Sequence, residues 1–411
     1  MYNMNRIVLI GNGFDLAHGL KTKYEHFIKW YWDQRLHNIV LEHNVVSADV
    51  LCSLKILPQS GCENWYLLSY NNSFFKDPFK NEWKLSGQEF IKELENRPDS
   101  FEITYSPFLK NICKSIETKK WVDIENEYYR LLTKYALEDK SENDVYALNN
   151  QLAEMRGLLI DYLNTINVQE IKANSQIRSK LYSPIKEDDI AIGSKRLFDD
   201  YIDWCMKQEQ DYWKSKMIKY GDQFSYIDVE NYKENLEKGY AEKYPRPFMM
   251  PDNIMLLSFN YTKTASLYET DNFKTNYIHG RLEHFESVIF GYGDELDEKY
   301  KELQNSGNND CLYNIKSIKY LESDNYRKVL DFIESDLFQV CIMGHSCGNS
   351  DRTLLNTLFE HRNCISIKPY FHESNDGTDN YLELAQNISR NFKDMKLMRD
   401  RVVNKTYCDK L

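Results

Sequence analysis

A short apolar run that ends in a glycine loop is the feature that most limits what this chain can fold into. Residues 6–10 read Arg-Ile-Val-Leu-Ile and stop at Gly11, as a buried parallel strand does. After the loop 11–15, Thr22 and Glu25 have the spacing of a helix capping box, and apolar residues follow at helical spacing. The order strand, glycine loop, helix predicts the first unit of an α/β fold with a parallel sheet.

The same pattern, an apolar run before a polar loop, returns in residues 252–411. The runs are residues 254–259 before Asn260, 277–278 before His279, 288–290 before Gly291 and 338–343 before Gly344. Because ligands bind beyond the carboxyl ends of the strands in an open parallel sheet, the polar residues after these runs are expected to gather at one edge. This convergence predicts a binding site there.

Residues 80–245 have a helical character instead. Apolar residues between Val145 and Tyr162 recur three and four positions apart, which predicts a long amphipathic helix, and residues 196–243 also look helical. A cluster of prolines at 245–251 ends this pattern. We therefore expect an α/β core built from residues 1–35 and 252–411, with residues 36–251 as a mainly helical insertion or cap.

The composition excludes several classes of protein. A net charge of −11 over 411 residues disfavours nucleic-acid binding, because an acidic chain gains nothing from counterion release. The nine cysteines include no Cys-x-x-Cys pair, so neither a zinc site nor a disulfide framework is expected. The N-terminal apolar run is too short for a signal peptide, and no run is long enough for a membrane span. We expect a soluble, cytoplasmic protein with reduced cysteines.

The glycine loop is the first candidate for ligand contact. It consists of Gly11, Asn12, Gly13, Phe14 and Asp15. Glycines let a backbone approach a phosphate or ribose closely, and exposed amides there can hold an anion. The third glycine of the dinucleotide fingerprint and the Walker lysine are both missing, however. A tight turn between strand and helix explains the two glycines equally well.

Asn260 and His279 are the candidates for catalysis. The amide of Asn260 can orient a ribose hydroxyl or a water, and an imidazole can exchange a proton near neutral pH. Tyr261 follows directly, and Thr262 is placed to cap a helix. The simpler explanations are an asparagine in a turn at a strand end and a buried, hydrogen-bonded histidine.

The loop at 344–351 connects an apolar run to a predicted helix. Gly344, His345 and Ser346 stand at its start, and Ser350 or Asp351 can cap the helix, whose free amides suit an anionic ligand. Plain capping explains Asp351 but leaves the rest of the run unexplained. The Gly-x-Ser-x-Gly elbow of serine hydrolases is absent.

Glu125 is the remaining candidate. Positions 121, 125, 128 and 132 share one helix face, so Glu125 falls within an aromatic and aliphatic stripe. A buried glutamate needs a partner, a proton or a ligand. It therefore either lines a pocket or forms an ion pair with a nearby lysine or arginine.

Residues 10–20, Ile-Gly-Asn-Gly-Phe-Asp-Leu-Ala-His-Gly-Leu, resemble the N-terminal signature of the bacterial abortive-infection AbiH family. Residues 121–125, 259–261, 278–280 and 344–346 resemble later blocks of that family in the same order, and the likeness extends from residue 6 to about 370. The resemblance implies a role in defence against phage, in which the infected cell stops growing or dies. It also implies a phage component as trigger.

The order of these motifs is distantly similar to the sirtuin-like NAD-binding fold, a Rossmann-like parallel sheet. That likeness implies NAD as ligand or substrate and cleavage at the nicotinamide–ribose bond. Asn260 would then hold the ribose or water, His279 would serve as base or ribose ligand, and Asp15 or Glu125 would stabilise positive charge. The first loop departs from the sirtuin pattern at Asn12 and Asp15, and the paired zinc cysteines are missing, which argues against deacetylation.

The sequence is also compatible with two other functions. One is a nucleotide-binding sensor or interaction module without turnover, whose helical region would bind a partner or a second copy in a homo-oligomer. The other is a metal-dependent enzyme acting on nucleotides or nucleic acids through Asp15, Glu125 and Asp294, because hard cations prefer oxygen ligands. Nothing in their spacing indicates that these carboxylates meet, and we predict no metal.

Overall fold

The computed structural model describes residues 3–40, 46–57, 76–77, 82–83, 92, 95–96, 98–99, 101–119, 123–166, 171–220, 243–271, 273–374 and 376–411. The chain forms two compact units. The sheet unit comprises Met1–His18, Val168–Arg281 and Tyr320–Leu411, and the helical unit comprises Gly19–Asn167 and Leu282–Lys319. These boundaries differ from the expected ones, since residues 19–35 and 282–319 group with the helical unit and residues 168–251 with the sheet unit.

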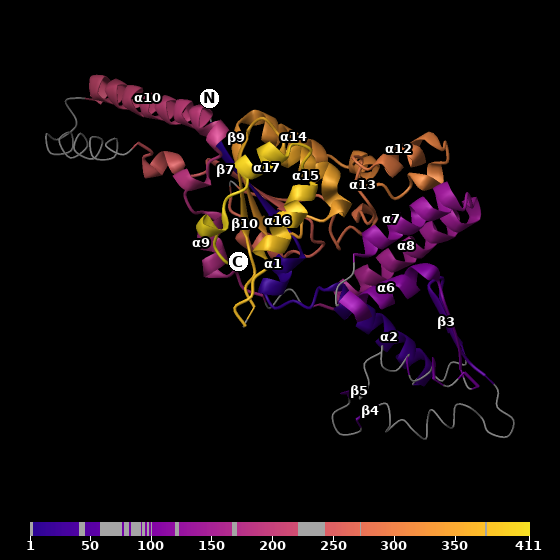
Figure 1. Ribbon diagram of the computed structural model, residues 1–411. Helices are drawn as coiled ribbons and strands as arrows, with labels where there is room; N and C mark the ends of the chain where they lie inside the picture. Colours follow the sequence, from indigo (N-terminus) through magenta and orange to yellow (C-terminus); the bar gives the residue numbers. More distant parts are fainter. Residues whose placement is uncertain are drawn as a thin grey trace. The chain divides into compact units, whose positions relative to one another are not determined.

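The sheet unit contains a five-stranded sheet in which all neighbours are parallel (Figure 1). The order is β10-β9-β1-β7-β8, with β1 Met4–Ile10, β7 Asn253–Ser258, β8 Thr275–Tyr277, β9 Leu337–Met343 and β10 Cys364–Tyr370. Counted along the chain, this is the order 3-2-1-4-5 of a doubly wound fold. The predicted Rossmann-like α/β sheet is confirmed.

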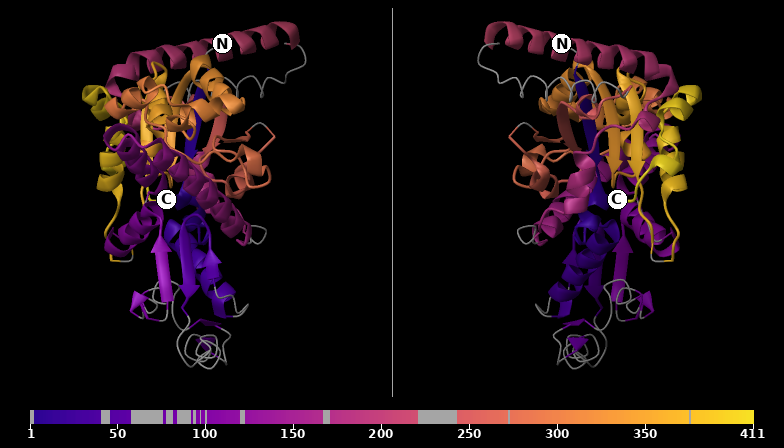
Figure 2. Two further views of the ribbon diagram at one scale, coloured as in Figure 1. Left: turned by 90° about the vertical axis from the view of Figure 1, so that its right-hand side faces the viewer. Right: turned by 90° about the vertical axis from the view of Figure 1, so that its left-hand side faces the viewer.

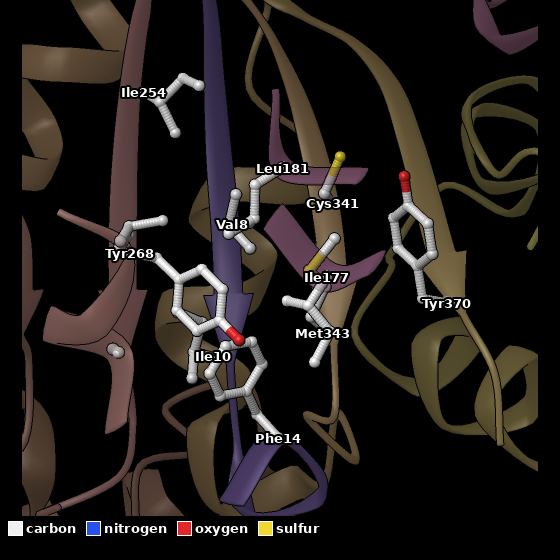
Figure 3. Packing of buried hydrophobic residues seen from close by; sticks show 12 residues of the cluster. Val8, Ile10, Phe14, Ile177, Leu181, Ile254, Tyr268, Cys341, Met343 and Tyr370 are labelled. Carbon is white, nitrogen blue, oxygen red and sulfur yellow. The ribbon is translucent and has the colours of Figure 1, made fainter. Parts of the chain in front are cut away.

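Strand β1 lies in the middle of the sheet, and all seven of its residues are buried. Alternate residues of β1, such as Val8 and Ile10, face an apolar cluster that α9 and the aromatic rings of Phe14 and Tyr268 cover (Figure 3). Helices α14, α15, α16 and α17 pack against the strands as well. A strand buried on both faces needs a continuous apolar run, which explains why residues 7–10 are all apolar.

The described helices of the sheet unit come from all three of its chain segments. They are α1 Asn12–Ala17, α9 Ser175–Leu181, α10 Lys195–Tyr220, α14 Asn325–Ser335, α15 Arg352–Phe359, α16 Tyr381–Arg390 and α17 Met395–Arg401. Short 3-10 helices span Glu187–Asp189, Ile192–Ser194, Arg246–Met249, Thr264–Tyr268, Tyr320–Glu322, Asn349–Asp351 and Lys405–Tyr407. Helix α10 lies at the end of the sheet where the strands begin (Figure 2). It covers the first part of the predicted helical stretch 196–243, of which residues 221–242 lie outside the described residues.

The helical unit packs helices around α8. Its helices are α2 Tyr24–Val40, α6 Pro107–Lys119, α7 Ile124–Thr133, α8 Glu142–Asn164, α12 Glu298–Asn305 and α13 Lys316–Lys319, with shorter turns at Lys134–Glu138, Phe285–Ser287 and Asn309–Cys311. Strands β2 Val46–Ala48, β3 Cys52–Ile56 and β6 Phe101–Tyr105 form an antiparallel sheet, and β4 Lys76–Asp77 pairs with β5 Glu82–Trp83. Helix α8 confirms the amphipathic helix predicted from Val145 to Tyr162, and its apolar stripe is buried.

Two expectations about the strands were wrong or incomplete. Residues 288–290 form no strand but an irregular buried segment of the helical unit, where Tyr292 exchanges backbone hydrogen bonds with Asn314 and Lys316. Conversely, β10 is a full strand that the sequence did not reveal, because Lys368 and Pro369 interrupt its apolar run. Among the described helices, none combines the length and apolar character that a membrane span requires.

Candidate functional site

The glycine loop and the loop after β9 touch backbone to backbone. The Gly11 amide donates to Met343 O (3.3 Å), and the Gly13 amide donates to Gly344 O (2.8 Å). A Cβ on Gly11 would lie 2.5 Å from His345 Cα, and a Cβ on Gly344, whose φ is +76°, would lie 2.1 Å from Phe14 N. The glycines therefore permit the contact of two loops at the point where the strand order reverses, which is where doubly wound sheets bind ligands.

This contact changes the expectation for the loop amides. The Gly13 amide, expected to face an anion, donates to Gly344 O, and the Phe14 amide donates to Gly11 O. Helix α1 begins at Asn12, so the loop is already the first turn of a short helix. The amides of Gly11, Gly13 and Phe14 are thus used in hydrogen bonds within the protein.

Asp15 and Asn260 lie next to this loop contact. Asn260 Nδ2 donates to Gly11 O (2.9 Å), which links the end of β7 to the end of β1. Thr262 Oγ1 donates to Asp15 Oδ2 (2.6 Å), whereas Asp15 Oδ1 has no hydrogen-bond partner among the described residues. Burial raises the pKa of Asp15, although the hydrogen bond from Thr262 and the nearby polar side chains of Thr264 and Asn260 oppose that shift.

The expected helix cap at Thr262 is wrong. The 3-10 helix begins at Thr264 after Lys263, and the Thr262 hydroxyl serves the buried carboxylate of Asp15 instead. A buried charge needs a donor more than an exposed helix end does, which explains this use of the hydroxyl.

A second cluster joins the ends of β8 and β9. His279 Nε2 lies 3.2 Å from Asp351 Oδ1, and His345 Nε2 lies 3.5 Å from Asp351 Oδ2. The Tyr320 hydroxyl lies 3.3 Å from His279 Nε2. The Phe259 ring packs against both imidazoles, with centroids 5.3 Å from His279 and 4.0 Å from His345. All five side chains are buried.

The structure also corrects the expected role of Asp351 as a capping residue. Asp351 occupies the N-cap position of α15, but its side chain makes no capping hydrogen bond. The carboxylate faces the two imidazoles instead. The side chain of Ser346 is exposed, and its backbone oxygen accepts from Asn387 Nδ2 (2.9 Å).

The remaining residues of the predicted site differ in their exposure. Phe14 is fully buried in the apolar core beside Tyr268, so its side chain serves packing (Figure 3). Asn12 is exposed and Tyr261 is half-buried. These positions leave Asn12 and Tyr261 as surface residues beside Gly11 and Asn260.

Glu125 belongs to the helical unit, where it forms an ion pair. Lys316 Nζ donates to Glu125 Oε2 (2.8 Å), and the Gly291 amide donates to Glu125 Oε1 (3.1 Å). Glu125 and Lys316 are both buried. Of the alternatives that the sequence left open for Glu125, the structure shows the ion pair with a lysine. The end of its predicted helix face at Trp121 lies outside the described residues.

Metal ligands do not gather in the described part of the chain: no group of three histidine, cysteine, aspartate or glutamate side chains there is arranged to hold a metal ion. Asp15 lies in the sheet unit, while Glu125 and Asp294 belong to the helical unit. A shallow surface pocket is lined by Glu334, Asn356, Thr357, Glu360, His361 and Arg362. It lies at the amino ends of β9 and β10, away from the loops described above.

Sequence reasoning missed Tyr320 and Phe259. Tyr320 lies 41 positions from His279, beyond a segment that belongs to the other unit, so no local pattern pointed to it. Phe259 ends an apolar run and belongs to the block 259–261, but no role was predicted for its ring. Its position directly before Asn260, at a strand end, was the available signal.

One of three comparisons with known proteins gives a match. The model of the family "Bacteriophage abortive infection AbiH" matches residues 7–372, which include all the loops described above. No curated protein and no solved structure gives a significant match to the chain. Because the family model matches most of its length, the chain belongs to the AbiH family of bacteriophage abortive infection proteins.

Proposed function

We propose that the sheet unit binds NAD at the carboxyl edge of its sheet and cleaves the nicotinamide–ribose bond. The observation that carries the proposal is the gathering of Asp15, Asn260 and His279 around the touching loops at the reversal of the strand order. A buried carboxylate oxygen without a donor, Asp15 Oδ1, supports a ligand that supplies a hydroxyl or a positive charge. A phage-defence role agrees with the proposal, because loss of NAD stops the metabolism of an infected cell.

The proposed reaction uses these side chains in distinct roles. Asn260 positions the ribose or the attacking water, and the ionised carboxylate of Asp15 stabilises positive charge that develops on the ribose. His279 accepts a proton from water as its oxygen bonds to the ribose carbon. The bond to nicotinamide breaks with its electron pair on the leaving nitrogen. The products are nicotinamide, ADP-ribose and one proton.

The test follows NAD and nicotinamide over time with the purified full chain. Asn260→Ala and His279→Ala are compared with the wild type and with His284→Ala, an exposed histidine outside the site. We expect the wild type and His284→Ala to release nicotinamide, and the other two variants to be slower by about 10² to 10⁴, the usual contribution of a positioned acid–base group.

A binding measurement separates catalysis from binding. If NAD raises the thermal unfolding temperature of the wild type but no nicotinamide appears, the chain is a sensor and the hydrolysis is wrong. If neither turnover nor binding occurs, the NAD proposal fails altogether. Turnover that persists in both His279→Ala and Asn260→Ala would remove the assigned roles.

A further inference from the structure

Asp351 connects two buried imidazoles. Its Oδ1 lies 3.2 Å from His279 Nε2, and its Oδ2 lies 3.5 Å from His345 Nε2. The three residues are each less than a tenth exposed, with fractions of 8, 4 and 6% for Asp351, His279 and His345. A buried carboxylate requires donors, and the Nε2 atoms of the two rings face its oxygens.

The tautomer of His345 follows from its other nitrogen. The Cys347 amide donates to His345 Nδ1 (3.0 Å), so Nδ1 carries no proton. Cys347 has a φ of +55°, a left-handed conformation that accompanies the return of its amide toward the ring two residues earlier. The neutral His345 ring therefore carries its proton on Nε2, the nitrogen that faces Asp351 Oδ2 at 3.5 Å.

His279 presents one nitrogen to two oxygens. Its Nε2 faces both Asp351 Oδ1 (3.2 Å) and the Tyr320 hydroxyl (3.3 Å). An ionised carboxylate is a much stronger acceptor than a phenol, so the Nε2 proton goes to Asp351. In that tautomer Nδ1 is the basic atom of the ring.

The aromatic ring between the histidines restricts their orientation. Phe259 meets His279 edge-on at an interplanar angle of 88° and packs against His345 at 53°. Rotation of either imidazole about its ring bond would require Phe259 to move. The carboxylate thus acts on rings whose planes are already held by packing.

We propose that Asp351 is a positioning residue that fixes His279 with its proton on Nε2, and that His345 holds Asp351 in place for this purpose. The catalytic consequence rests on the proposed NAD cleavage. There, His279 Nδ1 takes the proton of the attacking water as the oxygen bonds to the ribose carbon and the bond to nicotinamide breaks. The Asp351 carboxylate then stabilises the imidazolium, which releases its proton to solvent.

The test reads the tautomer directly. The full chain is labelled with ¹⁵N-histidine, and long-range couplings between ring protons and nitrogens identify the protonated nitrogen of His279, assigned by comparison with His279→Gln. We expect Nε2–H in the wild type. In Asp351→Asn the new amide can donate to Nε2, so we expect the proton of His279 to move to Nδ1. A proton on Nδ1 in the wild type, or no change in Asp351→Asn, would overturn the proposal.

Tyr320→Phe provides the matched control. It removes the competing hydroxyl and keeps the ring, so His279 should keep its proton on Nε2 if Asp351 sets the tautomer. A change of tautomer in Tyr320→Phe would assign that role to Tyr320 instead. If Asp351→Asn fails to fold, the wild type and Tyr320→Phe together still decide between the two acceptors.

The kinetic readout separates this proposal from the proposed function. Where the wild type cleaves NAD, Asp351→Asn should lower kcat by about 10² to 10⁴ while KM changes little, as expected for a residue that orients a general base. Where the wild type does not cleave NAD, the proposed function fails, but the ¹⁵N measurement still tests the role of Asp351.

Discussion

Asp15 is a carboxylate in an environment that disfavours its charge. Only 1% of the residue is exposed, and one carboxylate oxygen has a single hydroxyl donor while the other has none among the described residues. Burial therefore raises its pKa above the ordinary value of 3.8. A residue that weakens the fold in this way is typical of a site where a ligand completes the hydrogen bonds.

The raised pKa of Asp15 predicts that the free energy of unfolding depends on pH. Above the ordinary value and up to the raised pKa, the folded chain holds a proton on Asp15 that the unfolded chain has lost, so stability falls as pH rises through this window. Asp15→Asn cannot ionise. We expect it to increase the free energy of unfolding by about 1–3 kcal/mol at about pH 8, and by much less at about pH 4.

Urea unfolding of the wild type and Asp15→Asn at the two pH values measures this difference. Asp203→Asn, an exposed aspartate on α10, is the control and should show little change at either pH. An equal effect of Asp15→Asn at both pH values would show that ionisation of Asp15 is not the cause. If Asp15 also contacts the ligand, the more stable variant should lose NAD binding.

At the scale of elements, the contact between the loops after β1 and β9 fixes the candidate site. Gly11 and Gly344 allow it because any side chain would collide with backbone across the gap. The sequence left the glycines after β1 open to either a ligand or a tight turn. In the structure they first serve the approach of one loop to the other, and Asn260 then attaches β7 to the same point.

Gly344→Ala should therefore lower the stability of the fold by more than the left-handed backbone conformation of residue 344 alone would cause. Gly377 has a similar φ of +83° but nothing within 4 Å of its would-be Cβ, so Gly377→Ala measures the cost of the left-handed conformation, about 1–2 kcal/mol. We expect Gly344→Ala to lower the free energy of unfolding by about 1–3 kcal/mol more, because Phe14 N must move. Equal losses in the two variants, measured by urea unfolding, would mean that the loops separate without cost.

At the scale of the whole molecule, the chain passes between the two units four times, at residues 18/19, 167/168, 281/282 and 319/320. Three of these passages lie within a few residues of Asp15, His279 or Tyr320. The excursion 282–319 belongs to the helical unit, where Lys316 and Gly291 attach it to Glu125. Glu125 therefore has a structural role there, whatever its relation to a ligand.

Breaking this buried ion pair should destabilise the helical unit strongly. Lys316→Met leaves Glu125 without its cation, and we expect a loss of about 3–5 kcal/mol. In the double variant Glu125→Gln/Lys316→Met, no charge remains and the glutamine oxygen can still accept from the Gly291 amide, so most of the loss should be recovered.

Thermal or urea unfolding of the single and double variants gives the coupling between the two residues. Lys328→Met removes an exposed pair with Asp324 and should cost no more than about 1 kcal/mol. If the double variant is as unstable as Lys316→Met, the loss of stability comes from losing the ion pair and not from leaving a buried carboxylate unpaired. Retained NAD cleavage in the double variant would confine Glu125 to its structural role.

The sequence by itself determined the elements that have a clear apolar pattern. The apolar run that stops at Gly11 predicted a buried strand, and the three-and-four spacing from Val145 to Tyr162 predicted an amphipathic helix; both elements are present. The strand-end positions of Asn260 and His279 followed from the same periodicity. Because a buried charge requires a partner, the sequence indicated that Glu125 could form an ion pair. It did not indicate that the partner would be Lys316.

Only the tertiary structure decided which polar groups meet. Thr262 serves Asp15 and not a helix end, Asp351 serves two histidines and not a helix cap, and Tyr320 reaches His279 after an excursion through the other unit. The run at 288–290 is apolar enough for a strand, yet it packs in the helical unit. Local patterns specify burial, whereas hydrogen-bond partners far apart in sequence depend on which strand edges the sheet brings together.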